Sequence, residues 1–411
     1  MKTLILCALA AAGALGSWNA AAADAGSVEE RLKKLETQVE GLQKENISLK
    51  KELGYDPKAS ATFVKETGKG SKLSLGGFLQ GQAEFGDSPD VRFDGLNDRA
   101  LLRRARVSVT GAFLENFDYK IEFDLSANTL GASTGARGQL TDYFLNWNRY
   151  EFANLKFGQY KTHFGWEQIL SDTKTLTIER SLPNDRLTDG RQIGASVTGA
   201  LLEKRLSYAV GVFNGSGVNT SNNDDDQFMT TARVQGTALK TEWNKWAVEA
   251  NVGANVLVSR DTSVSKTGFG FGTATTAAGT NIFEGRRAAW GVDTQVKVGP
   301  FDVQAEYLRS YFEPKNNTPS NDTIADGFYI TTGYYILPKQ FQAILRWETF
   351  DPHEGRADDR TDVWTFGLNY YLKGDDLKLM ANYLLGSQSP GTADGRRDGR
   401  GRVLLRAQMM F

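Results

Sequence analysis

From Leu73 to Phe411 the sequence alternates between apolar and polar residues almost without interruption, and this alternation limits most what the chain can fold into. A period of two places successive side chains on opposite faces of a β-strand. The pattern therefore predicts an all-β region of about sixteen strands. We expect them near residues 73–85, 100–114, 117–126, 139–149, 153–160, 191–202, 205–214, 227–238, 245–259, 285–298, 301–313, 327–337, 340–350, 361–372, 376–386 and 401–411.

The connections between these expected strands alternate in length. "LENF", "LEKR", "VGPF", "LPKQ" and "KGDD" are tight, whereas "NGSGVNTSNNDDDQ", "EPKNNTPSNDTIAD" and "GSQSPGTADGRRDGRG" are long and polar or glycine-rich. Short turns at one end and long loops at the other are typical of bacterial outer-membrane barrels, which also have an even number of strands. A soluble sandwich has no reason to alternate its connections so regularly. The sequence therefore predicts a sixteen-stranded antiparallel transmembrane β-barrel.

The two faces of the expected strands differ in chemistry. In "ALLRRARVSVTGAF" (residues 100–113), Val107 and Val109 share one parity, and Arg104 and Arg106 share the other. In a membrane barrel the apolar face meets lipid, so these arginines point into a water-filled lumen. Arg103 has the lipid parity, and we expect it near the outer rim or in a subunit interface. Phe411 ends the last strand on the lipid parity and resembles the C-terminal assembly signal of bacterial barrels.

The N-terminus predicts the compartment. Lys2, an apolar stretch from Leu4 to Leu15 and small residues up to Ala23 form a secretory signal peptide over residues 1–23. Cys7 is the single cysteine and lies inside this peptide, so disulfides, thiolate catalysis and cysteine-ligated metals are excluded from the mature chain.

The remaining composition excludes several further classes of function. A net charge of -1 gives no reason to expect a nucleic-acid partner. The two histidines, His163 and His353, are far apart in sequence, so we expect no metal site. No catalytic motif stands out, so we expect neither an enzyme nor a cofactor.

Between the signal peptide and the barrel, the period of the sequence changes. Apolar residues and Asn46 recur at spacings of four and three at positions 28, 32, 35, 39, 42, 46, 49 and 53, which predicts a coiled-coil helix. A lone amphipathic helix that packs on the barrel or on a partner is the alternative. We expect residues 24–57 to form a periplasmic coiled-coil stalk and linker, and residues 58–411 to form the barrel.

Three segments carry a family resemblance. They are "RRARVSVTGAFLENFDYKIEFDL", "TDYFLNWNRYEFANLKFGQYKTHFGWEQILSDTKTLTIERSLPNDRL" and "RQIGASVTGALLEKRLSYAVGVFNGSG". They resemble the phosphate-selective porin (O/P-type) family of bacterial outer-membrane proteins, over roughly residues 70 to 411. The resemblance implies a homotrimer of sixteen-stranded barrels in the Gram-negative outer membrane, surrounded by its lipid. It also implies an inward loop after the fifth barrel strand, and an arginine ladder that leads anions to a basic constriction.

The resemblance also implies the residues that line the pore. Arg103, Arg104 and Arg106 would form the ladder, Lys174 and Arg180 would lie in the inward loop, and Arg186 and Arg191 would lie where that loop returns. Asp142 would either moderate anion binding or serve as an ordinary lumen carboxylate. The expected function is passive diffusion of inorganic phosphate or other small anions. The alternative is a structural anchor that tethers the envelope to the cell wall through the coiled coil.

Overall fold

The computed structural model describes residues 33, 37, 38, 63–66, 71–126, 138–223, 225–265, 282–314, 322–355, 359–388 and 399–411. The chain divides into two units, Met1–Tyr55 and Asp56–Phe411. In the first unit the three described residues are helical, and Thr37 Oγ1 donates a hydrogen bond to the Lys33 carbonyl at 2.8 Å. The predicted signal peptide and nearly all of the predicted coiled coil lie outside the described residues.

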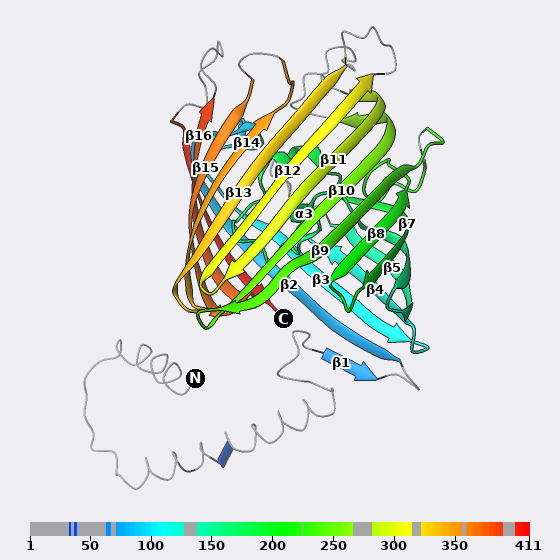
Figure 1. The fold of residues 1–411 in the computed structure, drawn as a ribbon. Helices are drawn as coiled ribbons and strands as arrows, with labels where there is room; N and C mark the ends of the chain where they lie inside the picture. Colours follow the sequence, from blue (N-terminus) through cyan, green and yellow to red (C-terminus); the bar gives the residue numbers. More distant parts are fainter. Residues whose placement is uncertain are drawn as a thin grey trace, which may run out of the picture. The chain divides into compact units, whose positions relative to one another are not determined.

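The second unit is a closed antiparallel barrel of sixteen strands, β2 to β17, in which each strand pairs with its neighbours in sequence and β17 pairs with β2 (Figure 1). This confirms the predicted barrel and places a described strand at each of the sixteen expected positions. The barrel strands are β2 (Lys72–Gly86), β3 (Arg99–Phe113), β4 (Phe117–Asp124), β5 (Gln139–Tyr150), β6 (Ala153–Lys161), β7 (Arg191–Leu201), β8 (Leu206–Phe213), β9 (Met229–Trp243), β10 (Trp246–Ser265), β11 (Ile282–Val298), β12 (Phe301–Pro314), β13 (Thr323–Leu337), β14 (Phe341–Asp351), β15 (Thr361–Lys373), β16 (Leu377–Gln388) and β17 (Gly401–Met410).

Tight turns join the strands at one rim of the barrel, and long connections join them at the other. At the turn between β9 and β10, Asn244 and Lys245 both have positive φ, 48° and 68°, which is the backbone of a two-residue hairpin turn whose twist matches that of the strands. The five tight connections predicted from sequence all lie at this rim. Because short turns are periplasmic in bacterial barrels, this rim faces the periplasm.

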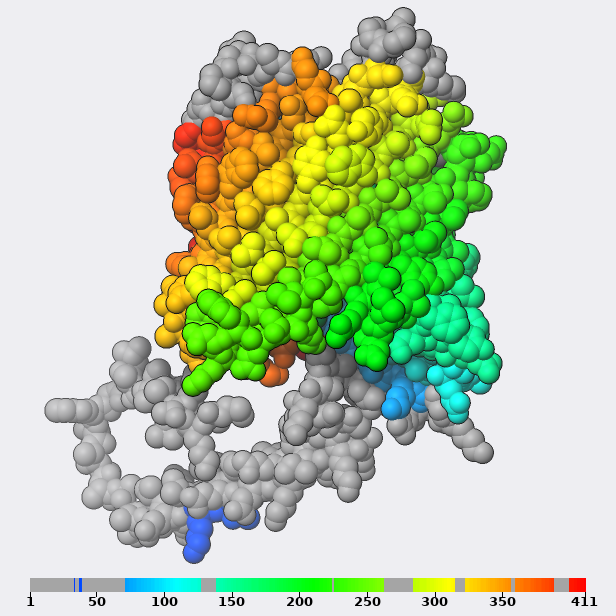
Figure 2. Space-filling model, viewed as in Figure 1, coloured from blue at the N-terminus to red at the C-terminus, as the bar shows by residue number. Residues whose placement is uncertain are grey.

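The outer wall of the barrel is apolar, as the alternation predicted. Ile121, Phe123 and Leu125 are exposed, whereas Glu122 and Asp124 are buried on the inner face. At the periplasmic rim the rings of Trp246 and Phe301 lie 6.4 Å apart and continue into a row of aromatic side chains. Such a row is typical of the membrane interface. Figure 2 views this wall over β9 to β15. Among the described residues, no helix is long and apolar enough to cross a membrane.

One short strand corrects the sequence prediction. None of the sixteen expected strands covers residues 63–66, but Phe63–Glu66 form β1, which pairs antiparallel with Lys72–Leu75 of β2. The last strand pairs with β2 only as far as Phe78, and Phe411 exchanges two backbone hydrogen bonds with Gly77. The strand β1 therefore pairs the stretch of the β2 edge that the last strand leaves free. A four-residue strand has too few residues for a clear alternation in sequence.

The lumen holds two segments that fold inward, and their packing also departs from the sequence prediction of a charged interior. Residues 162–190 carry α3 (Trp166–Ile169) and α4 (Leu182–Leu187), and residues 87–98 carry the 3₁₀ helix η1 (Val91–Phe93). Figure 1 shows α3 inside the barrel. Apolar residues of both segments are buried against inward-facing apolar residues of the wall. The first cluster includes Phe164, Leu182, Leu187, Leu257, Leu308 and Phe312, and the second includes Phe93, Ile178, Val363, Met380 and Leu404.

Candidate functional site: the inward loop and its basic wall

The segment 162–190, called the inward loop below, crosses the lumen because wall side chains satisfy its backbone and its acidic groups. Glu306 of β12 accepts hydrogen bonds from the backbone N–H groups of Trp166 and Glu167, at 2.5 and 3.3 Å. Glu348 of β14 accepts one from Leu182 N at 3.0 Å. Both carboxylates therefore satisfy donors at helix N-termini that have no partner within the helix.

A buried ion pair fixes the same part of the loop to the wall. Arg346 of β14 lies 2.5 Å from Glu167 in α3, and both side chains are only 2% exposed. The second carboxylate oxygen of Glu167 accepts a hydrogen bond from Ser181 N at 2.8 Å. This acid therefore links α3 and the N-cap residue of α4 to one wall residue.

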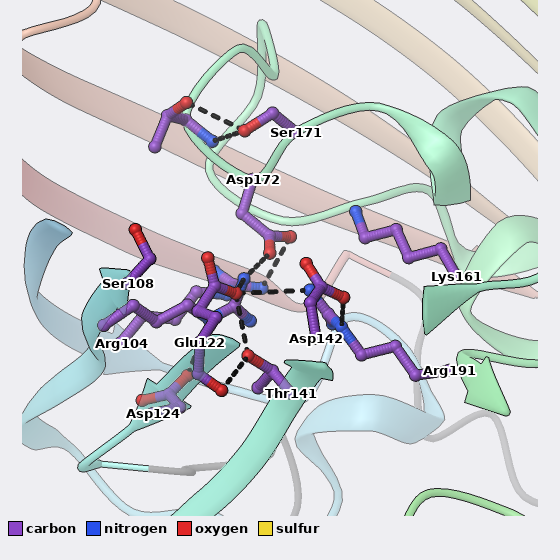
Figure 3. Close-up of polar contacts among 12 residues, drawn as sticks. Arg104, Ser108, Glu122, Asp124, Thr141, Asp142, Lys161, Ser171, Asp172 and Arg191 are labelled. Atoms are coloured by element: carbon purple, nitrogen blue, oxygen red, sulfur yellow. Dashed lines mark hydrogen bonds and ion pairs between the residues drawn. The ribbon is translucent and has the colours of Figure 1, made fainter. Parts of the chain in front are cut away.

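Two of the arginines expected to line the pore, Arg104 and Arg106, meet the loop at Asp172, and Figure 3 shows Arg104 and Asp172. Arg106 of β3 lies 2.6 Å from Asp172 Oδ2, and Arg104 lies 3.4 Å from Oδ1. Arg180, from the loop itself, lies 2.7 Å from Oδ1. Three guanidinium groups thus surround one carboxylate, and the structure brings together three of the basic residues expected from the resemblance.

Arg103 corrects the expectation that it faces lipid. Its neighbour Leu102 pairs with Gly81 while Arg104 pairs with Gln80, so Arg103 is an extra residue in a β-bulge. A bulge shifts the alternation by one residue and turns both Arg103 and Arg104 inward. Arg103 is 8% exposed and lies 2.9 Å from Glu179 of the inward loop.

Glu179 is the second acidic centre of the loop. Besides Arg103, Arg406 of β17 lies 2.6 Å from Glu179 and also donates to the carbonyl of Ile178. Lys378 of β16 donates to the Thr173 carbonyl at 2.8 Å. These basic wall residues bind the loop directly, although neither Arg406 nor Lys378 was among the expected pore-lining residues.

Asp142 belongs to a mixed group of charges on the adjacent wall. Arg191 and Lys120 lie 2.6 and 2.9 Å from its two oxygens, and Lys120 also lies 2.7 Å from Glu122. Glu122 in turn lies 3.5 Å from Arg106, which links this group to Asp172. Figure 3 shows Glu122, Asp142, Asp172 and Arg191 of this group side by side.

The remaining predicted residues lie differently. Lys174 is exposed and has no ion pair with any residue that the structure describes. Arg186 in α4 lies 3.7 Å from Asp185, away from the group around Asp172. Lys161, which was not predicted, ends β6 beside Asp172 in Figure 3 and donates to the Leu170 carbonyl at 2.7 Å.

The role of residues 87–98 was also missed. Arg92 in η1 binds Asp90 at 2.8 Å and Glu348 at 3.2 Å, and it donates to the carbonyl of Arg180 at 2.5 Å. This segment therefore braces the inward loop from the side of the long connections. "DVRF" begins with a good helix-capping aspartate, but a single turn gives little sequence signal.

Electrostatics keep the loop acids ionised. Burial alone would raise the pKa of Asp172, but the positive charges of Arg104, Arg180 and Lys161 hold it well below its usual value. Burial acts in the same direction on Glu179, and Arg103 and Arg406 likewise lower its pKa. Both acids therefore stay charged and neutralise part of the basic wall.

On the side of the loop that meets Asp172, Glu179 and Asp142, the cations outnumber the carboxylates, whereas Glu167, Glu306 and Glu348 add negative charge elsewhere along the loop. The cations are Arg103, Arg104, Arg106, Lys120, Lys161, Lys174, Arg180, Arg191 and Arg406, and the carboxylates are Glu122, Asp124, Asp142, Asp172 and Glu179. In the described part of the chain, no group of three metal-binding side chains is close enough to hold an ion. The arrangement can attract and bind anions, but it contains no evident nucleophile with a base beside it.

Comparisons with known proteins identify the family and the fold. The family model described as phosphate-selective porin O and P matches residues 79–411. Porin O of Pseudomonas aeruginosa is 25% identical over 403 residues, a match that covers 85% of this chain and 90% of that protein. The anion-selective porin from Comamonas acidovorans superposes with a TM-score of 0.57 at 9% identity, over 83% of this chain and 100% of that one. The trimer form of OmpT from Vibrio cholerae superposes with a TM-score of 0.57 at 12% identity, over 83% of this chain and 99% of that one. Identities this low show the fold alone.

Proposed function

Because this chain belongs to the phosphate-selective porin O and P family, we propose that it conducts phosphate or related small anions by passive diffusion past a basic constriction at the inward loop. The protein is a porin of the Gram-negative outer membrane, and its family and barrel indicate a channel. The preference for anions and the identity of the anion are the proposed parts.

The group around Asp172 carries the proposal. Arg104, Arg106 and Arg180 converge on a single carboxylate inside the lumen. Guanidinium groups donate several hydrogen bonds in a fixed plane and suit carboxylate and phosphate oxygens equally well. A site that holds the loop's own carboxylate has the chemistry to hold a permeating anion for a short time.

Exchange explains how such an anion could leave again. Asp172 and Glu179 each pair with arginines of the lumen and would compete with a permeating anion for them, so the anion never meets a fully unpaired basic ring. Binding must be strong enough for entry and weak enough for release, because conduction needs both. We propose that these two acids, together with Asp142, weaken binding to that degree.

A planar-bilayer experiment tests the proposal. In a potassium chloride gradient, the reversal potential should show anion preference, and added phosphate should reduce the chloride current in a saturable way. The double variant K174Q/R180Q should shift the reversal potential toward cations. A wild-type channel that prefers cations, or a chloride current insensitive to phosphate, would contradict the proposed function.

The oligomer and the stalk are further parts of the proposal. The resemblance to a trimeric family favours a homotrimer, and the apolar repeat over residues 28–53 favours a coiled coil that joins subunits or tethers the envelope. Deleting residues 24–57 separates the two roles. If conductance persists while envelope attachment is lost, the stalk serves as the tether, and light scattering of the purified protein reports the oligomer.

A further inference from the structure

Two arginines lie where the lipid-facing surface of β10 and β11 stops being apolar. The outward residues of β10 are Trp246, Val248, Ala250, Val252, Ala254, Val256 and Val258, and the next is Arg260. On β11 the outward residues Val292, Trp290 and Ala288 are followed by Arg286. The two arginines are therefore at the same boundary on neighbouring strands.

The arginines face each other and are poorly neutralised. Arg260 and Arg286 are direct cross-strand partners, and both are exposed. Like charges at such positions destabilise a sheet. Arg260 has no ion pair or hydrogen bond with the described residues, and Arg286 lies 3.8 Å from Glu313, with both of these side chains about half exposed. An exposed pair at that distance contributes little.

Sequence limits the other sources of negative charge. Residues 266–281, which connect β10 to β11, contain no aspartate or glutamate. Asp261, the residue after Arg260, is buried on the inner face of the wall. Glu284 has the outward parity, two residues before Arg286, but it pairs with neither of the two arginines. The two guanidinium groups therefore keep donors for an anion from outside the chain.

The position of Arg260 and Arg286 along the membrane normal indicates which anion could reach them. Arg260 follows the rim residue Trp246 by a stretch that spans about 46 Å at about 3.3 Å per residue, or about 33 Å of height at a strand tilt of about 45°. The apolar band of such barrels is about 25 Å tall. Arg260 and Arg286 therefore lie beyond the hydrocarbon, at the headgroup level of the leaflet on the side of the long loops. Figure 2 views this wall from outside.

We propose that Arg260 and Arg286 bind the phosphate of a phosphorylated lipid of the outer leaflet, whose acyl chains pack on Val258 and Trp290. Val258 is 45% exposed and Trp290 is 38% exposed, so both present apolar surface below the arginines. Two neighbouring guanidinium groups can share the oxygens of one phosphate, which removes the repulsion between them. The lipid would occupy an outward site that is separate from the lumen.

Native mass spectrometry of the delipidated mature protein tests this site. The probe is bisphosphorylated lipid A, and the test variant is R260Q/R286Q. A basic side chain near an anionic membrane surface strengthens lipid binding about fivefold to sixfold. Losing both arginines should therefore weaken lipid binding about thirtyfold. The control variant R149Q/R205Q removes the same charge from exposed arginines at the periplasmic rim and should bind as the wild type does. Conductance of R260Q/R286Q should be unchanged, which shows that the variant folds.

Three results would overturn the proposal. They are equal binding by R260Q/R286Q and the wild type, equal loss in R149Q/R205Q, and equal binding of dephosphorylated lipid A, which would mean that the lipid binds through apolar contact alone. A titration with sodium phosphate distinguishes lipid from free anion. Full displacement of the lipid by millimolar phosphate would assign the site to the free ion and contradict the lipid proposal.

Discussion

The guanidinium group of Arg106 on β3 lies 2.6 Å from Asp172 in the inward loop, which joins two residues far apart in the chain. Arg106 also binds Asp124 at 2.9 Å on the neighbouring strand. The residue therefore belongs both to the wall and to the loop. Arg106 thus holds the inward loop against the wall, and its positive charge also faces the anions that we propose to pass. Replacing Asp172 removes the first role and leaves the charge of Arg106 in place.

Replacing Asp172 by asparagine should increase anion preference. The variant keeps the shape of the side chain but removes a negative charge that three arginines share. At the intermediate dielectric of a narrow pore, one nearby charge changes anion occupancy by about 1 kcal/mol, or about fivefold. Reversal potentials in a salt gradient should move toward the anion limit, and phosphate should block chloride current at lower concentration.

The variant D226N is the matched control. Asp226 is exposed in the connection between β8 and β9 and has a positive φ of 58°, a conformation that asparagine also accepts. It should leave selectivity unchanged. Equal shifts in D172N and D226N would show that the field of the whole protein, and not the group around Asp172, selects the ion.

The variant K174Q should lower anion preference without changing stability. Lys174 is exposed and unpaired among the described residues, so its loss leaves no buried carboxylate without a partner. The reversal potential should shift toward cations, while the thermal unfolding midpoint stays within error. A second lumen lysine, Lys378, cannot serve as a control for this variant, because it donates a hydrogen bond to the Thr173 carbonyl of the inward loop. A drop in the unfolding midpoint of K174Q would show that Lys174 holds the loop in place.

The variant E167Q should loosen the inward loop. The variant removes the nearer of the two acids of Arg346 and leaves it only Glu348, at 3.8 Å, and breaking a buried ion pair typically costs about 3 kcal/mol. Limited proteolysis should then cut the loop faster, and the conducting channel should become noisier. E151Q, in an exposed pair with Lys204 at 2.9 Å, should have neither effect, because such pairs contribute little. Unchanged proteolysis of E167Q would mean that Glu306 and Glu348 hold the loop without it.

Deleting Phe411 should reduce the amount of assembled barrel more than it changes conduction. Phe411 exchanges hydrogen bonds of 2.9 and 3.0 Å with Gly77 at the seam where β17 meets β2. Its ring lies over Gly77, where even a Cβ atom would come within 2.8 Å of it. Heat-modifiable mobility on gels measures assembly. Normal insertion combined with altered ion selectivity would count against this prediction.

The charges on Asp172 and Glu179 should stay constant between about pH 5 and 8, so these two acids should cause no change in selectivity over that range. The pKa values of Asp172 and Glu179 lie below their usual range, so the stability that they contribute is complete above about pH 4 and is lost only as the pH falls through the lowered values. Burial, with Lys156 and Arg233 nearby, lowers the pKa of His163 to about 4, so this ring is neutral over the same range. A reversal potential that changes near pH 6 would indicate a different titrating group at the constriction.

Local sequence determined the strands of the barrel and their direction. Alternation along residues such as Ile121, Glu122 and Phe123 is a nearest-neighbour property, because a strand turns successive side chains to opposite faces. The rhythm of short and long connections also depends only on order along the chain. Both could therefore be predicted, and the sixteen expected strands are all present.

The constriction was decided by contacts between residues far apart in the chain. The basic residues of the ladder were expected from a family resemblance, but their partners Asp172 and Glu179 meet them only when the loop crosses the lumen. Arg103 faces inward because of a bulge opposite Gln80 and Gly81, and no repeat in the sequence reports a shift of one residue in pairing. Sequence fixes which charges are available, whereas closure of the barrel decides which of them neutralise one another, since ion pairing depends on distance in space.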